Sequence, residues 1–474
     1  MSARGPAALA AAALLLLPGC GSSFVDTLAA EDAPSAAVPE PGGSCERRAE
    51  PDPDRPVVSL DFRLDDDLRT VTGTETVVFT PDLPTGELVF RLVPNAPGAA
   101  AGGNRLAVDA VRGEDVAEGG YVAARAAAPG GLYEVRLDRE LASGESTEVA
   151  LDFTLSLGAA GFERVGSAEG VSWWASGAPL LAWEPGVGWA RDPFVDVVGE
   201  TASSPVADTR ISVSAPAELA VLMTGDQAEP TAVRDGRRTW TSTEPVARDV
   251  SVAVGRFTTA TVTTGSGVEV TTGVLPDPEV SAEALAGWAR EAVGALEERF
   301  GAFPYDTLTV PLLPSLGGGI EYPSSILLAG ANQLVLLHEV AHMWFYGMVG
   351  DSQFRDPWLD EAFASYAESV ADPVDEAEVA RRLATPGDVG SAMDGFPGSG
   401  AYFTRVYGKG GAALVAAREA AGAEAFDAAL RCYVQVNAWT TATPEDLAAA
   451  LDALPAALDV LLAAGALQPA DLPA

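Results

Sequence analysis

The chain contains 474 residues, 48% of them hydrophobic and 20% charged, so it is long enough for two or three domains and too apolar to be disordered. Its 67 acidic residues outnumber its 29 basic ones. The resulting net charge of -38 argues against binding to nucleic acids or to anionic lipid surfaces, because both are themselves polyanions.

The first twenty residues are typical of an export signal. The apolar run at residues 7–17 is too short, at about 1.5 Å per residue, to cross a bilayer core of about 30 Å. It is followed by Pro18-Gly19-Cys20, which resembles the lipobox of bacterial lipoproteins, whose cysteine is lipidated. We expect a signal peptide at residues 1–19 and lipidation of Cys20, with a plain secretory signal as the alternative. The protein would then be exported and held on the outer face of the cytoplasmic membrane by its N-terminal lipid alone.

Residues 20–54 form the next segment. They are rich in Ser, Pro, Ala, Glu and Gly without periodicity, which predicts a disordered tether. In an oxidising compartment, Cys45 and Cys432 either form a disulfide across nearly the whole chain or are unrelated, with Cys432 a buried apolar residue in a helix. The sequence leaves both interpretations open.

Residues 55–258 are predicted to form one all-β domain. Short runs of alternating apolar and polar residues, rich in β-branched side chains, are separated by turn signals such as Gly130-Gly131. The expected strands include residues 57–64, 74–79, 133–137, 148–155, 211–213 and 250–254.

Residues 259–474 are predicted to form an α+β domain. Apolar residues at three- and four-residue spacing predict a helix from about Ala284 to Phe300, which Gly301 ends. A strand at 308–313, a glycine-rich turn and an apolar run at 325–328 follow, and the chain is mostly helical beyond them.

Residues 338–342 read His-Glu-Val-Ala-His and contain the only two histidines of the chain. Positions i and i+4 of a helix lie on one face about 5–6 Å apart, so His338 and His342 can bind one metal ion while Glu339 faces a water on it. The alternative is a pair of core histidines bonded to the backbone. The motif predicts one zinc ion per chain.

A catalytic zinc site needs a third protein ligand. Eighteen residues separate His342 from Glu361, which lies near the start of a helix beginning Trp358-Leu359-Asp360. On that helix Glu361 shares a stripe with Glu368, opposite an apolar stripe, so its carboxylate can face the first helix. The spacing, together with the Trp-Leu-Asp-Glu sequence, resembles the gluzincin zinc metallopeptidases of the aminopeptidase N family.

The resemblance implies the fold as well. It implies a saddle-like all-β sandwich domain followed by a thermolysin-like α+β catalytic domain. Weaker similarities at residues 245–249, 300–305 and 430–447 extend it over nearly all of the mature chain. Because the chain stops soon after the last of them, we expect it to lack the large C-terminal helical domain of many members.

Residues 318–323, Gly-Gly-Ile-Glu-Tyr-Pro, resemble the exopeptidase motif GxMEN of this family. The resemblance implies that Gly318, Gly319 and Glu321 bind substrate, with Glu321 holding its free amino group. Ile320 replaces Met and Tyr322 replaces Asn, and the alternative is a solvated loop carboxylate.

Residues 407–410, Tyr-Gly-Lys-Gly, resemble the YxKG segment of the family and contain Lys409, the only lysine of the chain. The resemblance implies that Tyr407 stabilises the tetrahedral intermediate; the alternative is a core tyrosine. Asp360 and Glu368 would orient the histidines, unless they are helix-surface charges. Glu184 is the nearest candidate for a second amine anchor, although a surface carboxylate is the commoner fate.

The sequence therefore predicts a zinc aminopeptidase that acts on peptides. Glu339 would be the general base, Tyr407 the second catalytic residue, and His338, His342 and Glu361 the zinc ligands. Two alternatives remain, an endopeptidase without strict N-terminal specificity and a non-catalytic peptide-binding lipoprotein. The intact Glu339 speaks against the second, because a binding protein needs no general base.

Overall fold

The computed structural model describes residues 45, 47–159, 164–199, 202–314, 318–369 and 371–473. The expected signal peptide, Cys20 and the first part of the expected tether lie outside these residues. Within the described ranges, no helix combines the length and the apolar character needed to cross a membrane.

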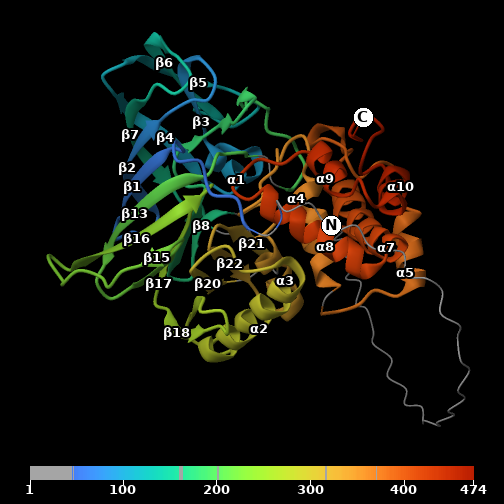
Figure 1. Cartoon of the computed structure of the whole chain (residues 1–474). Coiled ribbons are helices and arrows are strands. Elements are labelled where there is room, and N and C mark those ends of the chain that lie inside the picture. Colours follow the sequence, from blue (N-terminus) through green and yellow to red (C-terminus); the bar gives the residue numbers. More distant parts are fainter. Residues whose placement is uncertain are drawn as a thin grey trace, which may run out of the picture. The chain divides into compact units, whose positions relative to one another are not determined.

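The first domain is built from β-strands (Figure 1). A seven-stranded sheet has the order β15-β16-β13-β1-β2-β7-β4, and two four-stranded sheets have the orders β10-β3-β6-β5 and β14-β17-β9-β8. The strands are β1 Val57–Leu64, β2 Thr70–Phe79, β3 Thr85–Arg91, β4 Arg105–Arg112, β5 Val116–Val122, β6 Leu132–Leu141, β7 Thr147–Ser156, β8 Val165–Ala168, β9 Val171–Ala175, β10 Leu180–Leu181, β11 Trp183–Glu184, β12 Gly188–Trp189, β13 Ala207–Pro216, β14 Ala220–Met223, β15 Asp226–Gln227, β16 Arg237–Ala247 and β17 Ser251–Gly255. Strands β11 and β12 form a separate pair, and a short helix, α1 Pro97–Ala101, precedes β4.

Alternation along the strands explains this domain. In β1, Leu60, Phe62 and Leu64 are buried while Asp61 and Arg63 between them are exposed. Because successive side chains of a strand point to opposite faces, this pattern turns one face of the sheet to the core. The expectation of an N-terminal all-β domain is confirmed.

The second domain contains a mixed five-stranded sheet of order β18-β19-β20-β22-β21. Its strands are β18 Thr258–Thr263, β19 Glu269–Val274, β20 Thr307–Leu313, β21 Gly318–Tyr322 and β22 Ser325–Ala329. Its longer helices are α2 Ala282–Phe300, α3 Gln333–Ala341, α4 Trp358–Glu368, α5 Glu376–Leu383, α7 Gly411–Ala421, α8 Ala423–Val436, α9 Pro444–Ala450 and α10 Pro455–Ala464. Two shorter segments, α6 Ser399–Tyr402 and the π-helical η3 Phe403–Gly410, precede α7.

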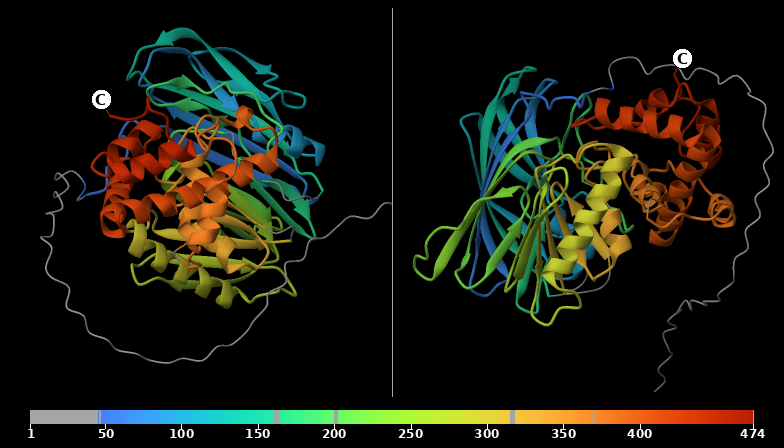
Figure 2. Two further views of the ribbon diagram at one scale, coloured as in Figure 1. Left: turned by 90° about the vertical axis from the view of Figure 1, so that its right-hand side faces the viewer. Right: turned by 60° about the horizontal axis from the view of Figure 1, so that its bottom comes forward.

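Helix α2 covers one face of this sheet (Figure 1). The side chain of Ser281 caps its first turn, and Leu285, Leu296 and Phe300 are fully buried. Gly301 follows with a φ of 95°, a conformation that favours glycine, and ends the helix where the sequence predicts. Helices α7, α8 and α10 lie on the side of the domain that faces away from the large β-sheet (Figures 1 and 2).

The expected glycine-rich turn before residue 325 is partly wrong. Gly318 and Gly319 belong to β21, which pairs antiparallel with β22 and forms an edge of the sheet. The short turn at Pro323-Ser324 joins the two strands. Position 319 requires glycine, because the Glu339 side chain occupies the space that a β-carbon would need.

A disulfide joins Cys45 to Cys432 in helix α8, with 4.9 Å between the Cα atoms. Beside it, the Ala49 amide donates to the Gln435 carbonyl at 2.9 Å, and the Arg48 guanidinium lies over the Trp439 ring. Arg48 and Ala49, which belong to the expected tether of residues 20–54, therefore contact the catalytic domain. The disulfide and this hydrogen bond offset the entropy of fixing the chain at this point.

Candidate metal centre and active-site cleft

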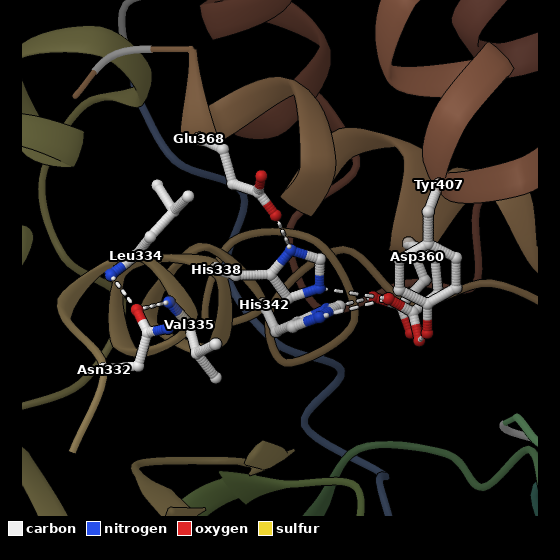
Figure 3. A network of polar contacts seen from close by, with 9 residues as sticks. Asn332, Leu334, Val335, His338, His342, Asp360, Glu368 and Tyr407 are labelled. Atoms are coloured by element: carbon white, nitrogen blue, oxygen red, sulfur yellow. Dashed lines mark hydrogen bonds and ion pairs between the residues drawn. The ribbon is translucent and has the colours of Figure 1, made fainter. Parts of the chain in front are cut away.

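Helix α3 carries the His-Glu-Val-Ala-His motif. The Asn332 side chain caps the helix by accepting from the Leu334 and Val335 amides at 2.9 and 3.3 Å (Figure 3). His338 and Glu339 lie in its last turns, and His342 is the residue directly after its end. The helix is almost wholly buried from Leu336 onward, so packing against its neighbours fixes the position of the motif.

Helix α4 brings the third candidate ligand to this motif. Its apolar stripe, which includes Phe363 and Tyr366, is fully buried, while Glu361 turns toward α3. The Nε2 atoms of His338 and His342 lie 3.3 and 3.5 Å from the same oxygen of Glu361, Oε2. Three potential ligand atoms of these residues thus lie within 4.8 Å of one another.

The Nδ1 atoms of both imidazoles contact carboxylates of helix α4. His338 Nδ1 lies 2.9 Å from Glu368 Oε1, and His342 Nδ1 contacts Asp360 Oδ1 (Figure 3). A carboxylate at Nδ1 holds the proton there and leaves the Nε2 lone pair directed at the centre. Asp360 is almost fully buried and Glu368 half-buried, so neither is the simple helix-surface charge of the alternative interpretation.

Burial and mutual contact shift the pKa values of this group. Burial lowers the pKa of His338, but its hydrogen bonds to Glu361 and Glu368 outweigh that effect and raise the pKa to about 10. Burial, reinforced by the charge of Glu321, raises the pKa of Glu339 to about 8. Burial likewise raises the pKa of Asp360 to about 7, although the adjacent His342 opposes it. A divalent cation at the centre would displace these protons, so metal affinity should fall at low pH.

The donor set fits zinc. Two neutral imidazoles and one carboxylate are the protein ligands of many catalytic zinc sites, which keep a fourth position open. Glu339 is only 5% exposed, and its Oε2 has no hydrogen-bond partner among the described residues. A buried carboxylate oxygen without a partner beside three converging ligand atoms is what a site for an ion and a water requires.

Glu339 lies directly above strand β21. A β-carbon added to Gly319 would lie 2.3 to 2.6 Å from the Cγ, Cδ and Oε1 atoms of Glu339, closer than real contacts allow. Glycine at position 319 therefore makes the room that the Glu339 carboxyl group occupies.

Glu321 lies two residues further along the same strand. It is 4% exposed, and its Oε1 has no partner among the described residues. Potential ligand atoms of Glu321, Glu339 and His342 also lie within 4.8 Å of one another. The interpretation of Glu321 as a solvated loop carboxylate is therefore wrong, because the edge strand turns it into the cleft.

Tyr407 is carried by the π-helical segment η3. Its hydroxyl donates to Glu361 Oε1, so the two oxygens of this carboxylate are divided between Tyr407 and the histidine pair. The Tyr407 and His338 rings are parallel with centroids 5.8 Å apart. Lys409 is buried and donates from Nζ to the Gly387 carbonyl at 2.8 Å, which fixes this segment rather than placing a charge in the cleft. Single π-helical turns are frequent at functional sites.

The candidate zinc ligands, Glu321, Glu339 and Tyr407 line an open cleft of ≈ 1960 Å³, a volume that includes the solvent at its mouth. One wall is the β domain, which contributes residues that sequence reasoning missed: Arg164, Ser176, Phe194 to Gly199 and Asp249. Only Asp249 carried a signal, since it ends the segment 245–249 that resembles the close of the family's β domain.

Glu184 lies neither in the cleft, where a second amine anchor would be, nor at the surface. It is 1% exposed, contacts Ser352 Oγ at 3.2 Å and pairs with Arg355, and it is not among the residues that line the cleft. The buried charge of Glu184 is compensated by the guanidinium of Arg355.

No protein-family model matches the chain. Aminopeptidase B of Mus musculus is 35% identical to it over 101 residues, which are 19% of this chain and 15% of that relative. The similarity to this curated relative thus covers less than a fifth of the relative's own length.

Solved structures match over much more of the chain. A two-domain M1 zinc metallopeptidase mutant bound to L-arginine matches 87% of this chain and 94% of its own, with a TM-score of 0.66 and 21% identity. An M1 zinc metallopeptidase mutant from Deinococcus radiodurans, bound to a Tyr-Ser-Ala substrate, matches 88% and 95%, with a TM-score of 0.65 and 20% identity. The chain therefore has the two-domain fold of the M1 zinc metallopeptidases, an all-β domain followed by an α/β catalytic domain.

Proposed function

We propose that the protein is a zinc-dependent aminopeptidase that removes N-terminal residues from peptides. The observation that carries the proposal is the convergence of Glu321 and Glu339 on the candidate zinc ligands within one open cleft. The peptide and amino acid bound in structures of the same fold agree with it.

His338, His342 and Glu361 would hold the zinc ion. When bound, zinc supplies Lewis-acid chemistry toward the scissile carbonyl and the attacking water. Glu339 Oε2 accepts the proton of that water and later returns it to the leaving amine nitrogen. Tyr407 keeps its proton because burial and the nearby Glu361 raise its pKa well above the usual value. Its hydroxyl, on turning from Glu361 Oε1, is then a donor for the developing oxyanion.

Glu321 would set the exopeptidase character. A carboxylate that faces a protonated amine in a partly desolvated cleft contributes about ten- to a hundredfold and more to kcat/KM. We therefore expect the zinc-loaded protein to hydrolyse aminoacyl-amide substrates with a free amine and to reject their N-acetylated forms. Glu321→Ala should weaken the first reaction and narrow the gap between the two.

This comparison also separates the alternatives. Cleavage of N-acetylated peptides at internal bonds as fast as free ones would replace the aminopeptidase with an endopeptidase and leave the zinc chemistry unchanged. Full zinc content without any hydrolysis would instead favour a peptide-binding protein.

A substitution at Gly319 tests whether the space above this glycine positions the Glu339 carboxyl group. We expect Gly319→Ala to keep the fold and the zinc but to lower turnover by at least about tenfold, because the added methyl group displaces the Glu339 carboxyl, and a shift of about 1 Å can cost a hundredfold. The matched control is Gly287→Ala in helix α2, where a β-carbon meets nothing within 4 Å. Equal turnover of the two variants would contradict the steric role of Gly319.

We further propose that the protein is exported and lipid-anchored through Cys20. The supporting observations are the lipobox-like sequence before Cys20 and the Cys45–Cys432 disulfide, since disulfides persist mainly outside the cytosol. Cys20→Ala should move the protein out of the membrane fraction, measured by fractionation and immunoblotting, with Cys45→Ala as the control. Unchanged membrane association would reject the lipid anchor.

A further inference from the structure

The hairpin that carries Glu321 is attached to the β domain through the residue next to it, Tyr322. The Tyr322 side chain is 1% exposed and packs in an apolar cluster with Trp173, Ala175 and Ala253 of the β domain. Tyrosine stands here where the GxMEN motif has asparagine, and its greater length lets it reach across the boundary between the domains.

The Tyr322 hydroxyl lies in the middle of a directed chain of hydrogen bonds. Arg164 Nη1 donates to it at 3.0 Å, and it lies 3.2 Å from Ser176 Oγ, which itself donates to Asp249 Oδ2. Because the Ser176 proton is directed to Asp249, Tyr322 is the donor to Ser176. The chain of hydrogen bonds thus runs from a partly buried cation, Arg164, to a partly buried carboxylate, Asp249, and Tyr322 is its only member from the catalytic domain.

The rest of the hairpin is held in the same way. Ser324 Oγ accepts from the Gly225 amide at 2.8 Å, and Ser325 Oγ lies 2.8 Å from Ser251 Oγ. Strand β21 pairs only with β22 among the described strands, so its other edge gets no support from the sheet. Its position against the cleft is therefore set by helix α3, which packs on it, and by these contacts with the β domain.

Arg164 also acts on Glu321 by charge. Both residues line the cleft. Burial lowers the pKa of Arg164, but the adjacent Tyr322 and Glu321 outweigh that effect and raise it above its usual value. Burial also raises the pKa of Tyr322 to about 12, so the hydroxyl stays protonated. The charged Arg164, whose guanidinium donates to the Tyr322 hydroxyl, thus attracts the Glu321 carboxylate by charge.

We propose that Tyr322 is a positioning residue for the amino terminus of the peptide: its hydroxyl, held between Arg164 and Ser176, fixes the edge strand that presents Glu321 to the substrate amine. The inference rests on the proposed function, because it acts through Glu321. It assigns the β domain a part in recognition of the amino terminus.

The test compares the kinetics of Tyr322→Phe and wild type on an aminoacyl-amide substrate with a free or an acetylated amine. Removing the hydroxyl takes one hydrogen bond from the Arg164 guanidinium and one from Ser176 Oγ. We expect KM for the free-amine substrate to rise about tenfold with kcat changed less than twofold, while hydrolysis of the acetylated substrate stays the same. Ser176→Ala should act in the same direction, and the double variant should cost no more than the larger single change.

Tyr366→Phe is the matched control, because Tyr366 is equally buried and its hydroxyl also accepts from an arginine, Arg299 Nη1, at 3.0 Å. It should lower the melting temperature without changing the ratio of free to acetylated rates. If Tyr322→Phe does not fold, Ser176→Ala carries the test, since it leaves the Tyr322 ring in place.

The outcomes separate the two proposals. Wild type that hydrolyses both substrates alike overturns the proposed function and this inference with it. Wild type that discriminates, together with a Tyr322→Phe variant of unchanged KM and discrimination, overturns the inference alone. A Tyr322→Phe variant whose kcat falls equally for both substrates would show that Tyr322 has only a structural role. The same conclusion would follow if Tyr366→Phe changed the ratio of free-amine to acetylated rates as much as Tyr322→Phe does.

Discussion

Replacing His342 or Glu361 by alanine is expected to leave the protein folded but unable to retain zinc. Each change removes one of three ligand atoms that lie within 4.8 Å of one another, and two remaining protein ligands do not hold a catalytic zinc tightly. Peptidase activity should fall by at least about a thousandfold, because the Lewis acid supplies several kcal/mol of transition-state stabilisation. Zinc content after dialysis and single-substrate kinetics measure both effects.

Removing the carboxylates at the Nδ1 atoms of the two histidines should reduce zinc affinity less than removing a ligand. Asp360→Asn and Glu368→Gln keep all three ligands and alter only the carboxylates at the Nδ1 atoms, so we expect a loss of about ten- to a hundredfold in zinc affinity. Glu298→Ala, at an exposed position of helix α2, is the control for removal of a carboxylate. Full zinc retention by His342→Ala or Glu361→Ala would contradict the ligand assignment.

The parts of the molecule that follow from local pattern could be predicted from the sequence. The alternation in β1 and the three- and four-residue spacing in α2 each fix which face is buried, and both elements have nearly the expected bounds. The two histidines were predictable from their four-residue spacing, and Glu361 from its distance of eighteen residues to His342, from the Trp-Leu-Asp-Glu resemblance and from its stripe on α4.

The parts that depend on contacts between the domains could not be predicted. Arg164 and Ser176 lie more than a hundred residues from Tyr322 in the chain, and no local pattern links them. Glu184 and Arg355 illustrate the same limit, since the burial of this carboxylate follows from an arginine that is distant in the chain. The pairing of Cys45 with Cys432 likewise required the fold.

The second large effect is expected for Glu339→Gln, which should keep the zinc but lose at least about a hundredfold in turnover. Glutamine has the shape of glutamate and fits the space above Gly319, so the ligands and the fold are unchanged. It cannot accept a proton, however, and a positioned general base contributes about 10² to 10⁴ in rate. Steady-state kinetics and zinc analysis of the same preparation provide the measurement.

The matched control for this change is Glu297→Gln in helix α2, where the carboxylate accepts from the Phe303 amide and does not line the cleft. It makes the same chemical substitution and should leave kcat within about twofold of wild type, because glutamine can still accept that hydrogen bond. A fall in zinc content in Glu339→Gln would mean that Glu339 contributes to metal binding. Near-normal turnover with zinc intact would remove Glu339 as the general base and leave the proton of the attacking water to another group of the cleft.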